Sequence, residues 1–301
     1  MSATLPRIAR VPARATDERL PGLIALVGLV VMYGPVYWWA ARGIWQTEEQ
    51  GHGPLVLAVL VWLFWTLRTR MADAPHAPAP LFGWPVFIAG LSVYTLGRAF
   101  DISILAFASQ ILVVAGALLL LKGPAALRLS WFAVAYQIFL VPLPGTFVDA
   151  VTGPLKHWIS VIVQNVLFAL DYPIANTGVI LSIGQYQLMV ADACSGLNSM
   201  FSLSALGTLF MYVMGRKSLL HNAIIVASIL PVAFVANIVR VIVLVLVTYH
   251  FGDEAGQGFL HGAAGIALMI VALFIFFALD AALASILQPR ASAGTAPVRE
   301  N

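Results

Sequence analysis

The stretch at residues 190–200, VADACSGLNSM, marks the point where a polar segment turns into an apolar helix. It contains Cys194, the single cysteine of the 301 residues. If the helix begins here, Cys194 lies in or beside its first turn, where unpaired backbone N–H groups and the positive end of the helix dipole favour the thiolate. A lone cysteine in an apolar chain is otherwise a small buried hydrophobe, so the rest of the sequence must decide between a reactive and a structural thiol.

The composition is that of an integral membrane protein. Hydrophobic residues make up 61% of the chain and charged residues only 10%, which is far from the balance of a soluble domain. One cysteine excludes an internal disulfide. The formal net charge of +3 is too small to suggest a nucleic-acid partner. The high hydrophobic fraction instead makes the lipid bilayer the expected partner.

Eight apolar segments are long enough, or nearly so, to cross a membrane. The second and the fifth are short. The segments are 22–41, 53–67, 81–96, 102–121, 130–143, 196–214, 222–247 and 262–287. The sequence therefore predicts an all-α integral membrane fold, a polytopic bundle of about eight transmembrane helices.

The basic residues predict the orientation of these segments. With the N-terminus in the cytoplasm, the cytoplasmic segments hold 12 of the 16 Lys and Arg residues, the opposite side holds only Arg42, Arg98 and Lys156, and Arg240 lies within a span. Both termini are then cytoplasmic and Cys194 faces outward, which in a bacterium is the periplasm. The chain divides into a basic cytoplasmic tail at 1–21, a transmembrane domain at 22–289 and a cytoplasmic tail at 290–301.

Residues 144–193 form an outer, periplasmic segment with room for structure outside the membrane. Residues 151–170 are apolar but carry Lys156 and His157, which favours a helix lying in the interface over a ninth crossing. Residues 179–183 and 186–190 flank Gly184-Gln185, which predicts a short β-hairpin leading to Asp192. Such a hairpin would hold Cys194 at the membrane edge.

Arg240 lies inside the apolar run 231–247, seven to ten residues before the next outer loop and therefore roughly 10–15 Å below it. An arginine at such a depth costs about 2.5–3.5 kcal/mol on insertion scales, and such residues normally face a cavity or a partner. Asn237 is about one turn deeper on the same face. The alternative is an arginine that snorkels to the interface or has a purely structural partner.

His261 opens the last apolar segment, followed by small residues that allow close helix approach. A single interfacial histidine is most often structural. However, Cys194, Arg240 and His261 all map to the outer portions of the last three segments, and packing of these helices could bring them together. Other histidines on the outer side are rival partners: His52, His157 and His250. Two histidines fall on the cytoplasmic side and are set aside: His76 and His221.

A cysteine, a histidine and an arginine on one face suit thiol acyl transfer. The thiolate attacks a peptide carbonyl, the imidazole serves as general acid and base, and the guanidinium stabilises the oxyanion or orients the substrate. The sequence has no second cysteine, no His-x-x-His pattern and no Gly-rich phosphate loop. It therefore predicts neither a metal nor a cofactor.

These motifs resemble those of the exosortases, and of their B-type subgroup in particular. The shared pattern is Asp192-Ala-Cys194-Ser195-Gly196 opening a span, Asn237-Ile-Val-Arg240 within the next span, and His261 at the start of the last. The stretch Gly51-His-Gly-Pro-Leu55 is a less specific likeness. Two positions depart from many relatives, which have Glu in place of Asp192 and Arg in place of Asn198, although the B-type is similar to this sequence at the second position.

The resemblance implies a multi-pass inner-membrane cysteine protease and transpeptidase. Its substrates would be exported proteins with a C-terminal signal made of a Pro-Glu-Pro motif, a transmembrane helix and a basic tail (PEP-CTERM), transferred to an unknown acceptor linked with exopolysaccharide or the cell surface. By the same likeness, Cys194 would be the nucleophile, Arg240 the transition-state stabiliser and His261 the acid and base, supported by Asp192, Ser195 and Asn237. The alternatives are a polytopic transporter, with Arg240 and Asn237 lining a substrate path, and a structural subunit of polysaccharide export.

Overall fold

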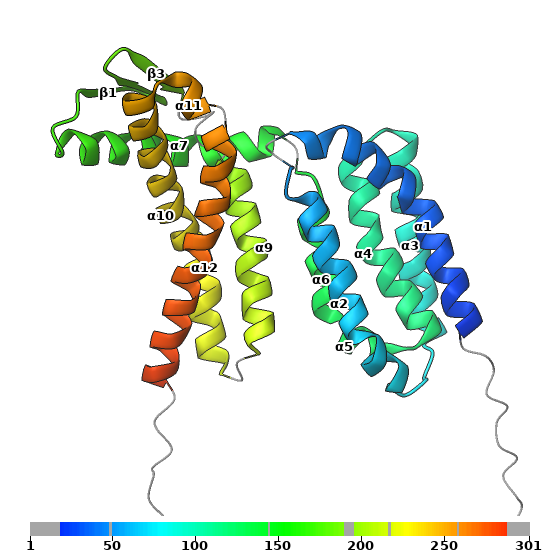
Figure 1. The fold of residues 1–301 in the computed structure, drawn as a ribbon. Coiled ribbons are helices and arrows are strands. Elements are labelled where there is room, and N and C mark those ends of the chain that lie inside the picture. Colours follow the sequence, from blue (N-terminus) through cyan, green and yellow to red (C-terminus); the bar gives the residue numbers. More distant parts are fainter. Residues whose placement is uncertain are drawn as a thin grey trace, which may run out of the picture.

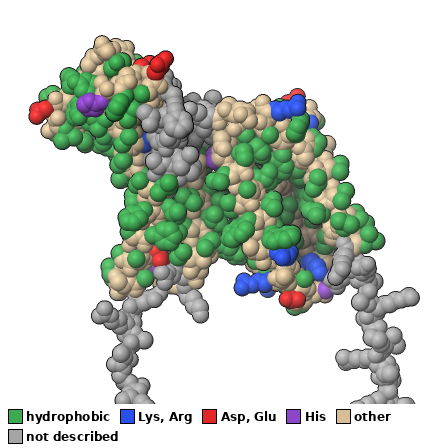
Figure 2. Space-filling view, viewed as in Figure 1, with side chains coloured by type: hydrophobic (Ala, Val, Ile, Leu, Met, Phe, Trp, Pro, Cys, Tyr) green, Lys and Arg blue, Asp and Glu red, His purple; other side chains and the backbone are tan. Residues whose placement is uncertain are grey.

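The computed structural model describes residues 19–47, 50–143, 145–189, 196–215, 218–257 and 259–287. Two groups of helices stand side by side (Figure 1). The flanks of both groups expose mostly hydrophobic side chains, whereas charged side chains gather toward the ends (Figure 2). This distribution is the one expected of a protein whose flanks face lipid.

The first group is made of the helices that precede residue 144. Its elements are α1 (Arg19–Arg42), η1 (Ile44–Gln46), α2 (Gly53–Asp73), α3 (Pro80–Ala99), α4 (Ser103–Leu121), α5 (Pro124–Leu129), α6 (Trp131–Tyr136) and η2 (Gln137–Leu140). The second group contains the three later apolar helices, a crosswise helix and a small sheet. Its elements are α7 (Gly145–Phe168), β1 (Ile174–Thr177), β2 (Ile180–Ile183), β3 (Tyr186–Met189), α9 (Gly196–Met214), α10 (Leu219–Phe251), α11 (Asp253–Gln257) and α12 (Phe259–Leu287).

Several helices have the length and composition of membrane spans. Among the described residues, α1, α2, α3, α4 and α10 are long and apolar enough to cross a bilayer. Three shorter apolar stretches coincide with the fifth, sixth and eighth predicted segments: Trp131–Leu140, Phe201–Met214 and Ile270–Ile286. The predicted helical, multi-pass membrane fold is confirmed, whereas the number of eight crossings stays a prediction.

Helices α3 and α4 pack closely because glycines line their contact. A Cβ placed on Gly116 of α4 would lie 2.7 Å from the backbone of Phe87, and one on Gly90 of α3 would lie 2.8 Å from the backbone nitrogen of Val113. Small residues at such positions let two helix backbones approach in a membrane, where dispersion and not the hydrophobic effect holds helices together.

Replacing Gly116 with alanine is expected to destabilise the first group by about 1–3 kcal/mol, because the added methyl forces two helix backbones apart. The measurement is the midpoint of thermal unfolding in detergent. The matched control is Gly28→Ala in α1, where an added Cβ meets no atom within 4 Å. Equal midpoints for the two variants would contradict the packing argument.

Helix α7 runs across the upper ends of the other helices in Figure 1, below the sheet. Its buried positions recur at helical spacing, with Ile159, Val163 and Leu167 facing the sheet and α10, whereas Trp158 and Phe168 are exposed. An apolar side facing the core and another left exposed are expected of a helix in the membrane interface. The predicted crosswise helix is therefore found, starting six residues earlier than predicted.

The sheet is an antiparallel meander in the order β1-β2-β3. The predicted hairpin is confirmed as β2 and β3, in which Ile183 faces Tyr186 across the loop Gly184-Gln185. Gly184 has a φ of +57° and Gln185 is not among the residues with positive φ, which is the sign pattern of a type II′ turn. Strand β1 was not predicted, because its sequence IANT is short and polar.

Helix α10 connects two hydrophobic cores of the second group. Its later residues Val241, Leu244 and Val245 pack with the sheet and α7. Its earlier residues, such as Ile229 and Ala233, belong to a core shared with α9 and α12. The sheet is thus attached to the helix that carries Asn237 and Arg240.

A joint between the two groups lies at α6 and α9. The Tyr136 hydroxyl donates to the carbonyl of Ala205 at 3.2 Å. The rings of Phe132 and Tyr212 stack with centroids 4.0 Å apart. These contacts hold the first group against the helix that begins just after Cys194.

Candidate functional site

Asn237 and Arg240 lie one turn apart on α10 and are both buried. Their exposed fractions are 1% and 6%, and both side chains take part in polar or electrostatic interactions. An arginine that reaches the membrane surface would be exposed, so the burial does not fit the snorkelling alternative. Helix α10 continues eleven residues past Arg240, to Phe251. Arg240 is therefore roughly 16 Å from the end of the helix, slightly deeper than predicted.

These two residues lie at the boundary between the two cores of α10. The core shared with α9 and α12 ends at Ala236, and the fully buried part of the core under the sheet begins at Val241. A polar pair at this boundary is surrounded by apolar packing on both sides along the helix. Electrostatic interactions of a guanidinium are stronger in such surroundings than in water.

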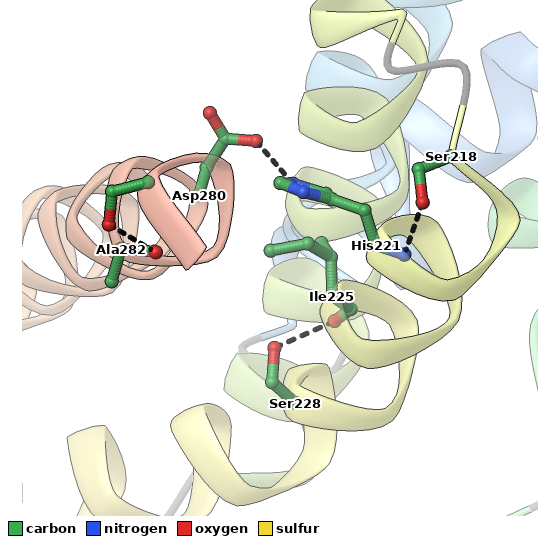
Figure 3. A network of polar contacts seen from close by, with 7 residues as sticks. Ser218, His221, Ile225, Ser228, Asp280 and Ala282 are labelled. Carbon is green, nitrogen blue, oxygen red and sulfur yellow. Dashed lines mark hydrogen bonds and ion pairs between the residues drawn. The ribbon is translucent and has the colours of Figure 1, made fainter. Parts of the chain in front are cut away.

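A second polar contact, which sequence reasoning missed, joins α10 to α12 near their other ends. His221 Nε2 lies 2.7 Å from Oδ1 of Asp280 (Figure 3). The exposed fractions of His221 and Asp280 are 1% and 5%. The predicted cytoplasmic side of His221 gave no reason to expect a role for it, and no prediction was made for Asp280. The signal that could have found the pair is an acidic residue inside an otherwise uncharged apolar segment.

The contact between His221 and Asp280 allows the heights of the other residues to be compared. Arg240 lies nineteen positions after His221 on α10, and Asp280 lies nineteen positions after His261 on α12. Each interval spans roughly 28 Å at the α-helical rise. Helices α10 and α12 run in opposite directions (Figure 1) and pack together. The equal intervals therefore put the backbone of His261 at about the height of Arg240.

The start of α9 lies at the same height by an equivalent comparison. Helices α9 and α10 are joined by a short connection and pack against each other. Met214 lies eighteen positions after Gly196, and Asn237 lies eighteen positions after Leu219. Gly196, the first residue of α9, is therefore about level with Asn237.

The remaining predicted residues are only partly described. Asp192, Cys194 and Ser195 lie outside the described residues, and Cys194 precedes the first residue of α9 by two positions. His261 is the third residue of α12, and its side chain also lies outside what the structure describes. The structure thus places Asn237, Arg240 and the beginnings of two helices at about the same height, while the meeting of the three side chains stays a prediction.

The rival histidines belong to other parts of the molecule. His157 is exposed on α7. His250 is exposed near the end of α10, and its Nε2 lies 3.3 Å from the Tyr172 hydroxyl. His52 precedes α2 in the first group and forms a hydrogen bond with the backbone of Phe139. His261 lies near the start of α12, which packs on α10, with its backbone about level with Arg240.

His52 is expected to make stability depend on pH. Burial lowers its pKa below the ordinary 6.5, and the hydrogen bond to Phe139 opposes this only in part. The neutral ring is favoured in the folded protein, so its contribution is complete above pH 6.5 and decreases as the pH falls below that value. His52→Gln should therefore weaken the decrease of the thermal midpoint between about pH 7 and pH 5. An unchanged slope would contradict this role.

Among the residues described, no group of three or more His, Cys, Asp or Glu side chains could hold a metal ion. The chemistry available from the described residues is that of a buried guanidinium and a buried amide, level with the starts of two helices. Together with the fold, this defines a class: polytopic membrane proteins with a buried arginine in a helix that packs on two others.

The chain belongs to the transmembrane exosortase family, whose family model matches residues 44–278. The match covers α2 to α6, the crosswise helix, the sheet and most of the last three apolar helices. Exosortases are in general membrane cysteine proteases or transpeptidases that act on protein substrates with sorting signals. No curated protein and no solved structure was found to match the chain.

Proposed function

We propose that this chain is a membrane cysteine protease and transpeptidase that cleaves C-terminal sorting signals of the PEP-CTERM type. Cys194 is the nucleophile, Arg240 stabilises the transition state and His261 is the acid and base, with Asp192, Ser195 and Asn237 in support. The observation that carries the proposal is the height of Arg240. This buried cation is level with the backbone of His261 and close to the level at which α9 begins, two residues after Cys194.

The proposed reaction proceeds through an acyl-enzyme. The Cys194 thiolate attacks the scissile carbonyl carbon, and the guanidinium of Arg240 compensates the charge that develops on the carbonyl oxygen. The peptide C–N bond breaks, and His261 gives a proton to the leaving amine. The thioester is then attacked by an acceptor amine or by water, whose proton returns to His261, and the thiolate leaves. Transfer and hydrolysis therefore differ only in the second nucleophile.

The site is proposed to face the periplasm of a bacterial inner membrane, with both termini in the cytoplasm. The distribution of basic residues supports this orientation, because 12 of the 16 fall on the same side of the predicted spans. A signal helix held in the same bilayer would present its cleavage point near the outer interface. The enzyme would then reach a substrate chain there without unfolding a soluble domain.

The proposed substrates are exported proteins with a Pro-Glu-Pro motif, a transmembrane helix and a basic tail. The unknown acceptor is linked with exopolysaccharide or with surface export. The test is co-expression of the full chain with a tagged protein that carries such a tail, followed by mass spectrometry of the product's C-terminus. We expect a product that ends at or near the motif, free or joined to an acceptor.

The control is the same tagged protein with the basic tail and membrane helix but a scrambled motif, which should stay intact. A thiol-blocking reagent applied from the periplasmic side should also prevent processing of the authentic signal. Full-length substrate in all samples, with wild-type enzyme present in the membrane, would refute the proposed function and favour a transport or structural role.

A further inference from the structure

The contact between His221 and Asp280 lies at the opposite end of α10 from Arg240. It joins the third residue of α10 to the eighth residue from the end of α12, at a distance of 2.7 Å between Nε2 and Oδ1 (Figure 3). Ser218 caps the start of α10 by accepting a bond from the backbone nitrogen of His221. The backbone and the side chain of His221 are therefore both held in place.

The described side chains that pack around this contact form an apolar core. The buried side chains around the contact include Ile225 and Ile229 on α10 and Ala272, Phe276 and Leu283 on α12. Apolar side chains of this kind tolerate small displacements, because dispersion contacts have no direction. A buried hydrogen bond has a narrow range of distance and angle, and an unsatisfied carboxyl or imidazole is costly in an apolar core. The polar contact is thus a directional element within this part of the interface.

We propose that His221 and Asp280 are positioning residues that set the register of α10 against α12. The intervals of nineteen residues on each helix then bring the backbone of His261 level with Arg240, at a distance of roughly 28 Å from the contact. Buried polar pairs that fix helix register are known in coiled coils. The catalytic consequence rests on the function proposed above for Arg240 and His261, whereas the register itself does not.

The test compares variants that separate stability from register in the full-length protein. Single variants His221→Leu and Asp280→Val leave a buried polar partner and are expected to lower the thermal midpoint. The double variant should recover the midpoint, because apolar replacements of both partners often restore packing. Its kcat is nevertheless expected to fall about 10²-fold with little change in KM, since a displacement of about 1 Å can have this effect. The exchanged pair, His221→Asp with Asp280→His, should regain part of the loss.

Register can be measured without substrate. In a Cys194→Ser background, spin labels are attached at Val243→Cys on α10 and Val271→Cys on α12, two positions that are 47% and 43% exposed. Their heights differ by about 20 Å, so a slide of one turn would change the axial separation by about 5 Å. We expect the distance distribution to shift or broaden in the double apolar variant.

The matched control is another buried polar contact that joins two helices. The Tyr33 and Ser109 hydroxyls lie 2.8 Å apart in the first group, and Tyr33→Phe should lower the midpoint without moving the labels or kcat. A double apolar variant with wild-type midpoint, distance distribution and kcat would overturn the proposed role. If wild-type enzyme processes no signal, the proposed function fails, and the label distances alone decide the register.

Discussion

Replacing Cys194 with serine is expected to reduce signal cleavage by about 10⁴-fold or more while the protein stays inserted in the membrane. A serine hydroxyl is not ionised near neutral pH, whereas the proposed mechanism requires a nucleophilic anion, which a thiol forms far more readily. The proposed role of His261 as acid and base suits a reaction in which sulfur is first the nucleophile and later the leaving group. The measurement is the initial rate of reporter cleavage by purified enzyme in detergent or vesicles.

Two controls accompany this variant. The amount of protein in the membrane fraction and its thermal midpoint should match the wild type, because the side chain changes by one atom. Alkylation of the wild-type thiol should reproduce the loss. A serine variant that still cleaves at more than a few per cent of the wild-type rate would exclude Cys194 as the nucleophile.

Replacing Arg240 with lysine is expected to lower kcat by about 10²–10³-fold, the range found when a single oxyanion-stabilising donor is removed. The charge is kept, but the planar fork of donors is lost and the ammonium is more strongly hydrated. Because Arg240 is 6% exposed, a shorter side chain cannot reach the same position by moving through solvent. The measurement is kcat and KM for the reporter, together with the thermal midpoint.

The same substitution on the surface provides the control for Arg240. Arg98 lies near the end of α3 and is exposed, so Arg98→Lys should leave kcat, KM and the midpoint nearly unchanged. If Arg240→Lys raises KM and leaves kcat intact, the guanidinium contributes to substrate binding alone and not to the transition state.

The hairpin and the apolar helices could be predicted because their signals are local. Gly184 between two short apolar runs predicts a two-residue turn, and the structure has that turn. The ends of the helices were predicted less well. The second segment was expected to end at residue 67, but α2 continues through Arg68 and Arg70 to Asp73. Hydropathy marks only the part of a helix that lies in lipid. The helix itself can continue into water, because arginine is a good helix former.

The part of the candidate site that could be predicted is the residue whose burial in a membrane costs much free energy. A charged side chain in an apolar span requires an explanation, and Arg240 is indeed buried beside Asn237. The contact of His221 with Asp280 was not predictable from local signals. It joins residues 59 positions apart, and the side of the membrane assigned to His221 gave a reason to ignore it. Only the packing of α10 on α12 reveals such a pair.

The stretch of α10 from Leu219 to Arg240 fixes the axial distance between the start of this helix and the buried guanidinium. Its twenty-one intervening steps measure roughly 31 Å, which is about the thickness of the hydrocarbon layer. A substrate helix that starts level with Leu219 and runs beside α10 would therefore reach the height of Arg240 after about the same number of residues. The peptide bond that reaches the site would then depend on the length of the substrate's membrane helix as well as on the residues around the bond. Lengthening that helix by one turn should therefore move the point of cleavage.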